Sequence, residues 1–89
     1  MAKPDKEELL AIICTLYELC PSIHCHVAPE TVRRATRLPG DRFSKAWRWL
    51  IRRGLIWCKS HGHRESCGPS RSLLKAARRH CPELWSSLE

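Results

Sequence analysis

The stretch from Trp57 to Cys67, "WCKSHGHRESC", gathers two cysteines and two histidines within eleven residues. Thiols and imidazoles at this density can form a disulfide or a redox dithiol, or they can hold a zinc ion or an iron–sulfur cluster. Which of these chemistries applies depends on how the backbone places the side chains. The residues on either side of the stretch therefore have to be considered with it.

These residues predict a β-hairpin. "LIWCKS" is apolar and aromatic, as strands are, "HGHR" offers a turn with Gly62 and His63 as its two loop residues, and "ESCG" is expected to return before Pro69 ends the pairing. In this register Cys58 faces Cys67 at a non-hydrogen-bonded pair, where Cα atoms approach to roughly 4.5 Å. A disulfide can bridge that separation.

The same geometry argues against a metal site in the hairpin. Side chains alternate faces along a strand, so His61 points away from Cys58, and a regular hairpin cannot gather the four candidate ligands Cys58, His61, His63 and Cys67. Zinc would need an irregular knuckle, which "CKSHGH" could form. We favour a disulfide or redox dithiol at Cys58 and Cys67, with no cofactor expected. A zinc or iron–sulfur site, or two small reduced cysteines, are the alternatives.

The other four cysteines give weaker signals. Cys14 and Cys20 lie six residues apart on one expected helix and do not share a face. Cys20 or Cys25 could meet Cys81 if the last helix packs back on the first. "CPSIHCH" could supply metal ligands, or simply small buried residues and a solvent-facing ring. Six cysteines suggest metal or redox chemistry in a reducing cytosol, and structural disulfides in a hyperthermophile.

Helical periodicity predicts four helices, at 6–19, 29–38, about 41–53 and 70–81, and the C-terminal "PELWSSLE" is expected to be a tail. Asp5 with Glu8 forms a capping pair, and Asp41 is the expected N-cap of the third helix. The expected inward positions are Leu9, Ile12, Ile13, Leu16, Leu19 and Cys20, then Val32, Ala35 and Leu38, then Phe43, Ala46, Trp47, Leu50 and Ile51, and finally Leu73, Leu74, Ala77 and Cys81.

Length and charge limit the classes of function. Eighty-nine residues predict a single domain, 1–89, and no apolar run is long enough to span a bilayer. Without a recognisable leader the expected location is the cytoplasm. Sixteen Lys and Arg against nine Asp and Glu leave a net charge of +7, which favours a polyanion, nucleic acid before an anionic membrane surface. Eleven of the cations are Arg, which suits phosphates and guanine edges.

Three helices, a hairpin with a basic tip and a further helix make an order that resembles the winged helix-turn-helix family. Residues 27–56, "VAPETVRRATRLPGDRFSKAWRWLIRRGLI", carry the likeness: a short helix, a turn, a recognition helix and an exit through Gly54, Leu55 and Ile56. "PSRSLL" is similar to the segment that follows the wing. The resemblance implies a mainly α fold with a small β-hairpin: a three-helix core, a short wing and a C-terminal helix.

The resemblance also implies that the third helix enters the major groove of double-stranded DNA while the hairpin reaches the backbone or the minor groove. The base-facing candidates are then Arg42, Ser44, Lys45 and Arg48, and the phosphate-facing candidates are Arg52, His63 and Arg64. Trp49 lies between the core side and the groove side of the helix. Pro69 and the absence of a Ser or Thr cap at Ala28 depart from the family pattern.

The expected function is therefore that of a small transcription regulator, with a DNA affinity that the wing cysteines could make redox-dependent. A homodimer is expected through the first helix and the tail around Leu84 and Trp85. No membrane partner or small-molecule substrate is expected. An enzyme is not expected, because paired carboxylates, a nucleophile with its base and a glycine-rich phosphate loop are all missing. The alternatives are a winged-helix protein-interaction adaptor and a metal or iron–sulfur redox switch.

Overall fold

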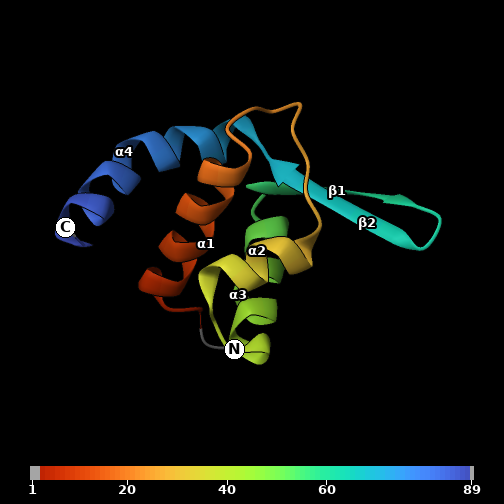
Figure 1. The fold of residues 1–89 in the computed structure, drawn as a ribbon, viewed down its shortest axis with the longest axis horizontal. Helices are drawn as coiled ribbons and strands as arrows, with labels where there is room; N and C mark the ends of the chain where they lie inside the picture. The colour runs from red at the N-terminus through yellow and green to blue at the C-terminus, as the bar shows by residue number, and fades with distance from the viewer. Residues whose placement is uncertain (1–2, 89) are drawn as a thin grey trace.

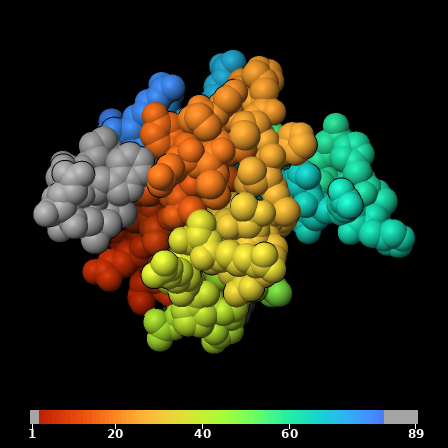
Figure 2. Space-filling view, viewed as in Figure 1, coloured from red at the N-terminus to blue at the C-terminus, as the bar shows by residue number. Residues whose placement is uncertain are grey.

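The computed structural model describes residues 3–88, and the side chains of residues 3–81. Its elements are α1 (Lys6–Leu19), α2 (Pro29–Thr36), α3 (Gly40–Arg52), β1 (Ile56–His61), β2 (Arg64–Pro69) and α4 (Arg71–Leu88). The hairpin of β1 and β2 projects from the body that the helices form, as both the ribbon (Figure 1) and the space-filling view (Figure 2) show. The predicted fold, mainly α with a small β-hairpin and a C-terminal helix, is confirmed.

The core forms around α1, which packs against α2, α3 and α4. Most predicted inward positions are buried, including Ile12, Leu16, Leu50 and Leu73. Three of them are wrong: Leu19 is 41% exposed, Ile51 is 36% exposed, and Ala35 is exposed. Leu19 is the last residue of α1, and the neighbouring Cys20 takes the buried position instead. Ala35 and Ile51 lie on α2 and α3, which are covered on one side only, so residues at the edge of their apolar stripe face water.

The register of the hairpin is the predicted one, with Cys58 opposite Cys67 and His61 opposite Arg64. Gly62 occupies the turn at φ +61°, a left-handed conformation that glycine adopts without steric cost. Contrary to the prediction, Pro69 does not end the pairing early. It is the last residue of β2 and pairs with Ile56, at a strand end where a missing N–H is tolerated.

The connector between α1 and α2 supports the other edge of β2. Val27 forms an isolated antiparallel bridge with Cys67, and each backbone N–H donates to the other residue's carbonyl oxygen at 2.8 Å. Gly68 follows directly, and a Cβ there would lie 2.3 Å from the carbonyl oxygen of Cys25. The base of the wing is therefore held from both sides.

The helix starts differ from the predicted caps. Asp5 is the N-cap of α1, but its side chain makes no capping hydrogen bond. Ala28 precedes α2, with Pro29 in the first turn. Asp41 is not the N-cap of α3, because the helix already begins at Gly40 after Pro39. The carboxylate of Asp41 lies in the first turn instead, where it suits the positive end of the helix dipole.

The predicted tail is helical. The backbone of α4 continues through Pro82 to Leu88, although a proline inside a helix removes one hydrogen bond. A disulfide from Cys81 to Cys14 holds the preceding turn of α4 on α1. The predicted docking of Leu84 and Trp85 concerns side chains outside the described ones. Of the helices that the structure describes, none is long and apolar enough to cross a membrane.

Candidate nucleic-acid interface

The exposed side of α3 and the segment before α1 form a groove of about 770 Å³. Four of the predicted DNA-binding residues line it together: Ser44, Lys45, Arg48 and Arg52. Lys3 and Pro4 form the other wall, and Trp49 and Arg53 complete the lining with Gly40 and Asp41. The structure thus brings together most of the predicted contact residues of the third helix, and it adds two cations, Lys3 and Arg53.

The amphipathic sequence of α3 explains this placement. Phe43, Ala46, Trp47 and Leu50 are buried on the side that faces the core. The rings of Phe43 and Trp47 stack with their centroids 5.2 Å apart, which fixes how the helix is turned. Because the apolar stripe is held by this packing, the basic residues of the opposite side face solvent.

Trp49 lies where the core and the groove meet. Its side chain is partly buried against the core, yet it also lines the groove. Nζ of Lys3 lies 5.3 Å from the centroid of the Trp49 ring, and Cζ of Arg53 lies 4.9 Å from it. Both distances suit cation–π contacts. Helical periodicity in the sequence could not identify these two cations as part of the groove. Lys3 precedes the first helix, and Arg53 lies one residue beyond the end of α3.

Arg42 lies apart from the other α3 candidates. Its Nη1 is 3.9 Å from Oε2 of Glu8 on α1, and it does not line the groove. The wing candidates also lie elsewhere: His63 and Arg64 are exposed at the hairpin tip, beside the Gly62 turn. The predicted DNA-binding residues therefore form one cluster on α3, with Arg42 at its margin and two residues on the wing.

The cations of the groove are available for an anionic partner. Within the described part of the chain, ion pairs involve Arg33 and Arg34 with Glu30, and Arg42 with Glu8. The hydrogen bonds from the Arg33 guanidinium lower the pKa of the Glu30 carboxyl and raise the pKa of Arg33 itself. No such pair involves the five groove cations, Lys3, Lys45, Arg48, Arg52 and Arg53. Unpaired cations on one surface favour phosphate binding.

All six cysteines are paired. The predicted disulfide between Cys58 and Cys67 is present, with Cα atoms 4.0 Å apart. The prediction that Cys20 or Cys25 meets Cys81 is wrong. Cys20 pairs with Cys25, because the connector after α1 turns back within five residues, and Cys14 on the buried side of α1 pairs with Cys81 of α4.

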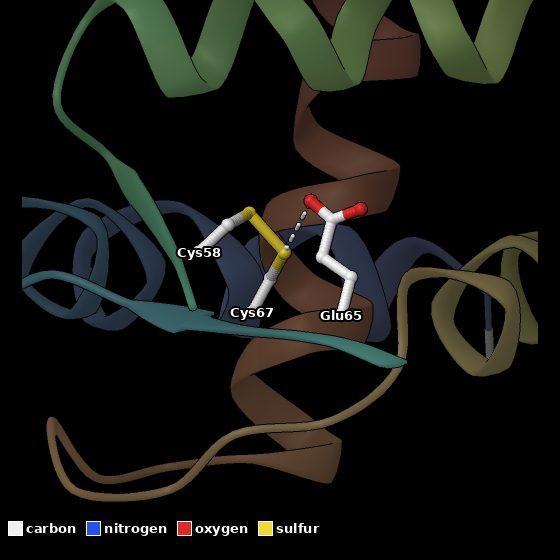
Figure 3. A group of neighbouring side chains, drawn as sticks. All are labelled: Cys58, Glu65 and Cys67. Carbon is white, nitrogen blue, oxygen red and sulfur yellow. Dashed lines mark hydrogen bonds between the residues drawn. A yellow bond between two sulfur atoms is a disulfide. The ribbon is translucent and has the colours of Figure 1, made fainter. Parts of the chain in front are cut away.

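The structure does not bring together the four candidate metal ligands Cys58, His61, His63 and Cys67. Within the described residues, the one group of three ligand atoms close enough to share an ion comes from Cys58, Glu65 and Cys67, all within 4.8 Å of one another (Figure 3). This group contains neither His61 nor His63. His61 instead lines a separate depression of about 280 Å³, with Ile23, His24, His26, Trp57, Lys59 and Ser66.

Comparison with known proteins identifies the fold. No protein-family model and no curated protein matches the chain. AF1382 from Archaeoglobus fulgidus superimposes with a TM-score of 0.74 at 15% identity, covering 96% of this chain and 91% of AF1382. S. aureus MepR in its DNA-binding conformation gives a TM-score of 0.73 at 19% identity, covering 94% of this chain and 64% of MepR.

A solved S. aureus MepR–DNA complex gives a TM-score of 0.67 at 17% identity, covering 93% of this chain and 74% of that one. The chain spans slightly less than two thirds of MepR in its DNA-binding conformation. These structures share the path of the chain with the protein, although few residues are identical. The protein has the winged-helix fold, as the residues at 27–56 predict.

Proposed function

We propose that the protein is a small transcription regulator that binds double-stranded DNA in a sequence-dependent manner, with α3 in the major groove. The observation that carries this proposal is the groove along α3, which collects five cations without an ion pair among the described residues. The fold supports it, since MepR, described as a transcription regulator of the multidrug efflux pump MepA, has also been solved with DNA.

The position of each side chain suggests its part in binding. Arg48 and Lys45, near the middle of the exposed side of α3, suit the O6 and N7 acceptors of guanine, and Ser44 can donate to or accept from several base edges. Arg52 and Arg53 at the helix end suit phosphates. Lys3 would meet the backbone from the other wall of the groove.

The wing would supply a second contact. His63 and Arg64 stand at the exposed tip of the hairpin and can reach a phosphate or the minor groove. The Cys58–Cys67 disulfide closes the hairpin near its base. We propose that opening this bridge leaves the strands paired but makes the hairpin tip more mobile, which lowers DNA affinity and makes binding depend on redox state.

The proposal also includes assembly and location. Two copies would pair through α1 and the last turns of α4, which would let one dimer read two half-sites. The protein would act in the cytoplasm. This cytoplasm would have to allow structural disulfides to persist, as that of hyperthermophiles does. Such a regulator needs no catalytic step, small-molecule substrate, membrane partner or cofactor.

The test is duplex DNA binding followed by fluorescence anisotropy at several salt concentrations. Arg48→Ala is expected to weaken binding by about 5- to 150-fold, the loss that follows from removing a base contact worth about 1–3 kcal/mol. Arg78→Ala is the matched control, because Arg78 is an equally charged, exposed residue on α4. It should change affinity less than threefold.

Two outcomes would contradict the proposal. Equal losses in the two variants would mean that only net charge matters and that α3 reads no bases. No binding to duplex DNA even at low salt would remove the regulator altogether, and the basic groove would then have to serve a protein partner, as in the adaptor alternative.

A further inference from the structure

Glu65 shares one face of the hairpin with the two wing cysteines. Cys58 and Cys67 are opposite each other in the register, and Glu65 precedes Cys67 by two residues, which returns its side chain to the same face. Oε1 of Glu65 lies 3.7 Å from Sγ of Cys67, and Figure 3 shows the carboxylate turned toward the disulfide. Two sulfurs and one oxygen thus lie within 4.8 Å of one another.

The charge of the Glu65 carboxylate is not balanced by a cation in the described part of the chain. Glu65 forms no ion pair among the described residues. The hairpin residues that carry positive charge, Lys59 and Arg64, alternate onto the opposite face. A cluster of acceptor atoms with an uncompensated carboxylate therefore lies on the hairpin of a strongly basic protein.

Reduction of the bridge would complete a ligand set. A dithiol reductant gives two electrons and two protons to the disulfide, so that its sulfur–sulfur bond breaks, Cys58 and Cys67 become thiols, and the reductant becomes its own disulfide. The two sulfurs stay close, because five other residue pairs hold β1 to β2 and the Val27 bridge holds β2 from its other edge. The backbone, more than the bridge, places the ligands.

We propose that the reduced hairpin is a binding site for a thiophilic divalent cation, with Zn²⁺ as the physiological case. The thiolates of Cys58 and Cys67 and one oxygen of Glu65 would be its protein ligands, with water in the fourth position of a tetrahedron. Binding converts both thiols to thiolates and releases two protons. Imidazole is not needed, so the site differs from the four-ligand knuckle that the sequence alone suggests.

With this site, β1 and β2 are cross-linked in both redox states of the wing. In the oxidised state a covalent bond joins β1 to β2 at Cys58 and Cys67, and in the reduced state the bound cation joins them at the same two residues. The site lies on the hairpin and away from the α3 groove. It does not rest on the proposed DNA binding, and either proposal can fail without the other.

The experiment is anaerobic titration of the reduced full chain with Co²⁺ and Zn²⁺, after opening the hairpin bridge with a mild reductant. Peptide mass mapping after alkylation identifies which bridges have opened. Cys67 is buried, but Cys58 is more exposed, whereas both ends of the Cys14–Cys81 bridge are buried. We expect one Zn²⁺ per reduced chain, none per oxidised chain, and a sulfur-to-cobalt charge-transfer band in the near ultraviolet with Co²⁺.

Three variants test the ligands. Cys58→Ser with Cys67→Ser should abolish binding and the charge-transfer band. Cys20→Ser with Cys25→Ser is the matched control, because it removes another short-range bridge and should keep both. Glu65→Gln changes an exposed residue and leaves both cysteines in place. It should weaken Zn²⁺ binding at least tenfold, because removing a group that only orients a metal ligand already costs about 10- to 100-fold.

Several results would overturn the proposal. Reduced protein that binds no Zn²⁺ has no such site. Equal losses in the two cysteine pairs would point to nonspecific thiol binding, and unchanged affinity in Glu65→Gln would remove the third ligand. If the helical circular dichroism signal disappears when the hairpin bridge opens, the folded reduced site does not exist.

Discussion

Nη1 of Arg42 lies 3.9 Å from Oε2 of Glu8, so the first basic residue of α3 is paired with a carboxylate of α1. The Glu8 side chain is only 14% exposed, and its Oε2 has no hydrogen-bond partner among the described residues. Arg42 is therefore the cation that keeps this carboxylate compensated. It joins α3 to α1, while the neighbouring cations of α3 line the groove.

The Arg42→Ala variant should accordingly separate stability from DNA binding. Because loss of the pair leaves the mostly buried Oε2 of Glu8 without a partner, it should cost about 1–3 kcal/mol in urea unfolding. DNA affinity should fall less than threefold, far less than in Arg48→Ala. If Arg42→Ala weakens binding as much as Arg48→Ala, Arg42 leaves Glu8 to contact DNA, as the sequence resemblance suggests.

Lys3 should contribute one phosphate contact from the second wall of the groove. Each neutralised phosphate contributes about 0.9 to the slope of log affinity against log salt. Lys3→Ala should therefore make that slope shallower by about 1, measured by anisotropy between low and moderate salt. Lys6→Ala, an exposed lysine at the start of α1 and outside the groove, should leave the slope unchanged. Equal slopes in the two variants would place Lys3 off the DNA.

Gly68→Ala should destabilise the wing base. The new Cβ would lie 2.3 Å from the carbonyl oxygen of Cys25 and 2.8 Å from an indole carbon of Trp57, so the backbone of the connector would have to shift. Overpacking of this kind costs about 1–3 kcal/mol, which chemical unfolding would detect. Gly40→Ala is the control, because nothing lies within 4 Å of its added Cβ. A neutral Gly68→Ala would show that the connector is not held against β2.

The three disulfides should differ in their contribution to the free energy of unfolding. Cys14 and Cys81 are separated by 67 residues, and Cys20 and Cys25 by 5. The loop-entropy relation gives about 4 kcal/mol for the long loop and about 2 kcal/mol for the short one. Paired Cys→Ala variants of each bridge, unfolded in guanidinium, would measure the difference. A larger loss for the short loop would mean that native-state packing outweighs chain entropy.

Acid should weaken the contact between Glu30 and Arg33. The pKa of Glu30 is lowered in the folded protein, chiefly by its hydrogen bond from Arg33. This stabilisation is therefore present above pH 4.5, the ordinary value, and is lost as pH falls from there through the lower folded-state pKa. Glu30→Gln should make the melting temperature depend slightly less on pH below 4.5. The effect is small because the pair is exposed, and an unchanged acid slope would exclude it.

Local patterns in the sequence predicted the parts of the fold that neighbouring residues determine. Helical spacing located α1 and α3, and the loop Gly62–His63 fixed the hairpin register, which in turn predicted the Cys58–Cys67 disulfide. The resemblance at 27–56 predicted the order of the elements. It also indicated Ser44, Lys45, Arg48 and Arg52, which the structure brings to one groove.

The features that were missed depend on residues far apart in the chain. The partner of Cys81 depends on how α4 lies across α1, and the orientation of Arg42 depends on Glu8, which periodicity in α3 cannot reveal. Lys3 reaches Trp49 from a segment without regular structure. Residues 82–88 were predicted to be a tail, whereas α4 continues through Pro82 to Leu88, with the loss of one helical hydrogen bond at the proline.

The pairing of the cysteines also constrains the order in which the chain can be completed. Six cysteines allow fifteen pairings, and the two short bridges, 5 and 9 residues apart, can close as soon as their own segments exist. Cys14 has to wait for Cys81, which follows 67 residues later in the chain. A growing chain that does not yet include Cys81 therefore carries one unpaired thiol at Cys14, which can exchange with the two bridges already made. Correct oxidation of this protein therefore requires that α4 has been made.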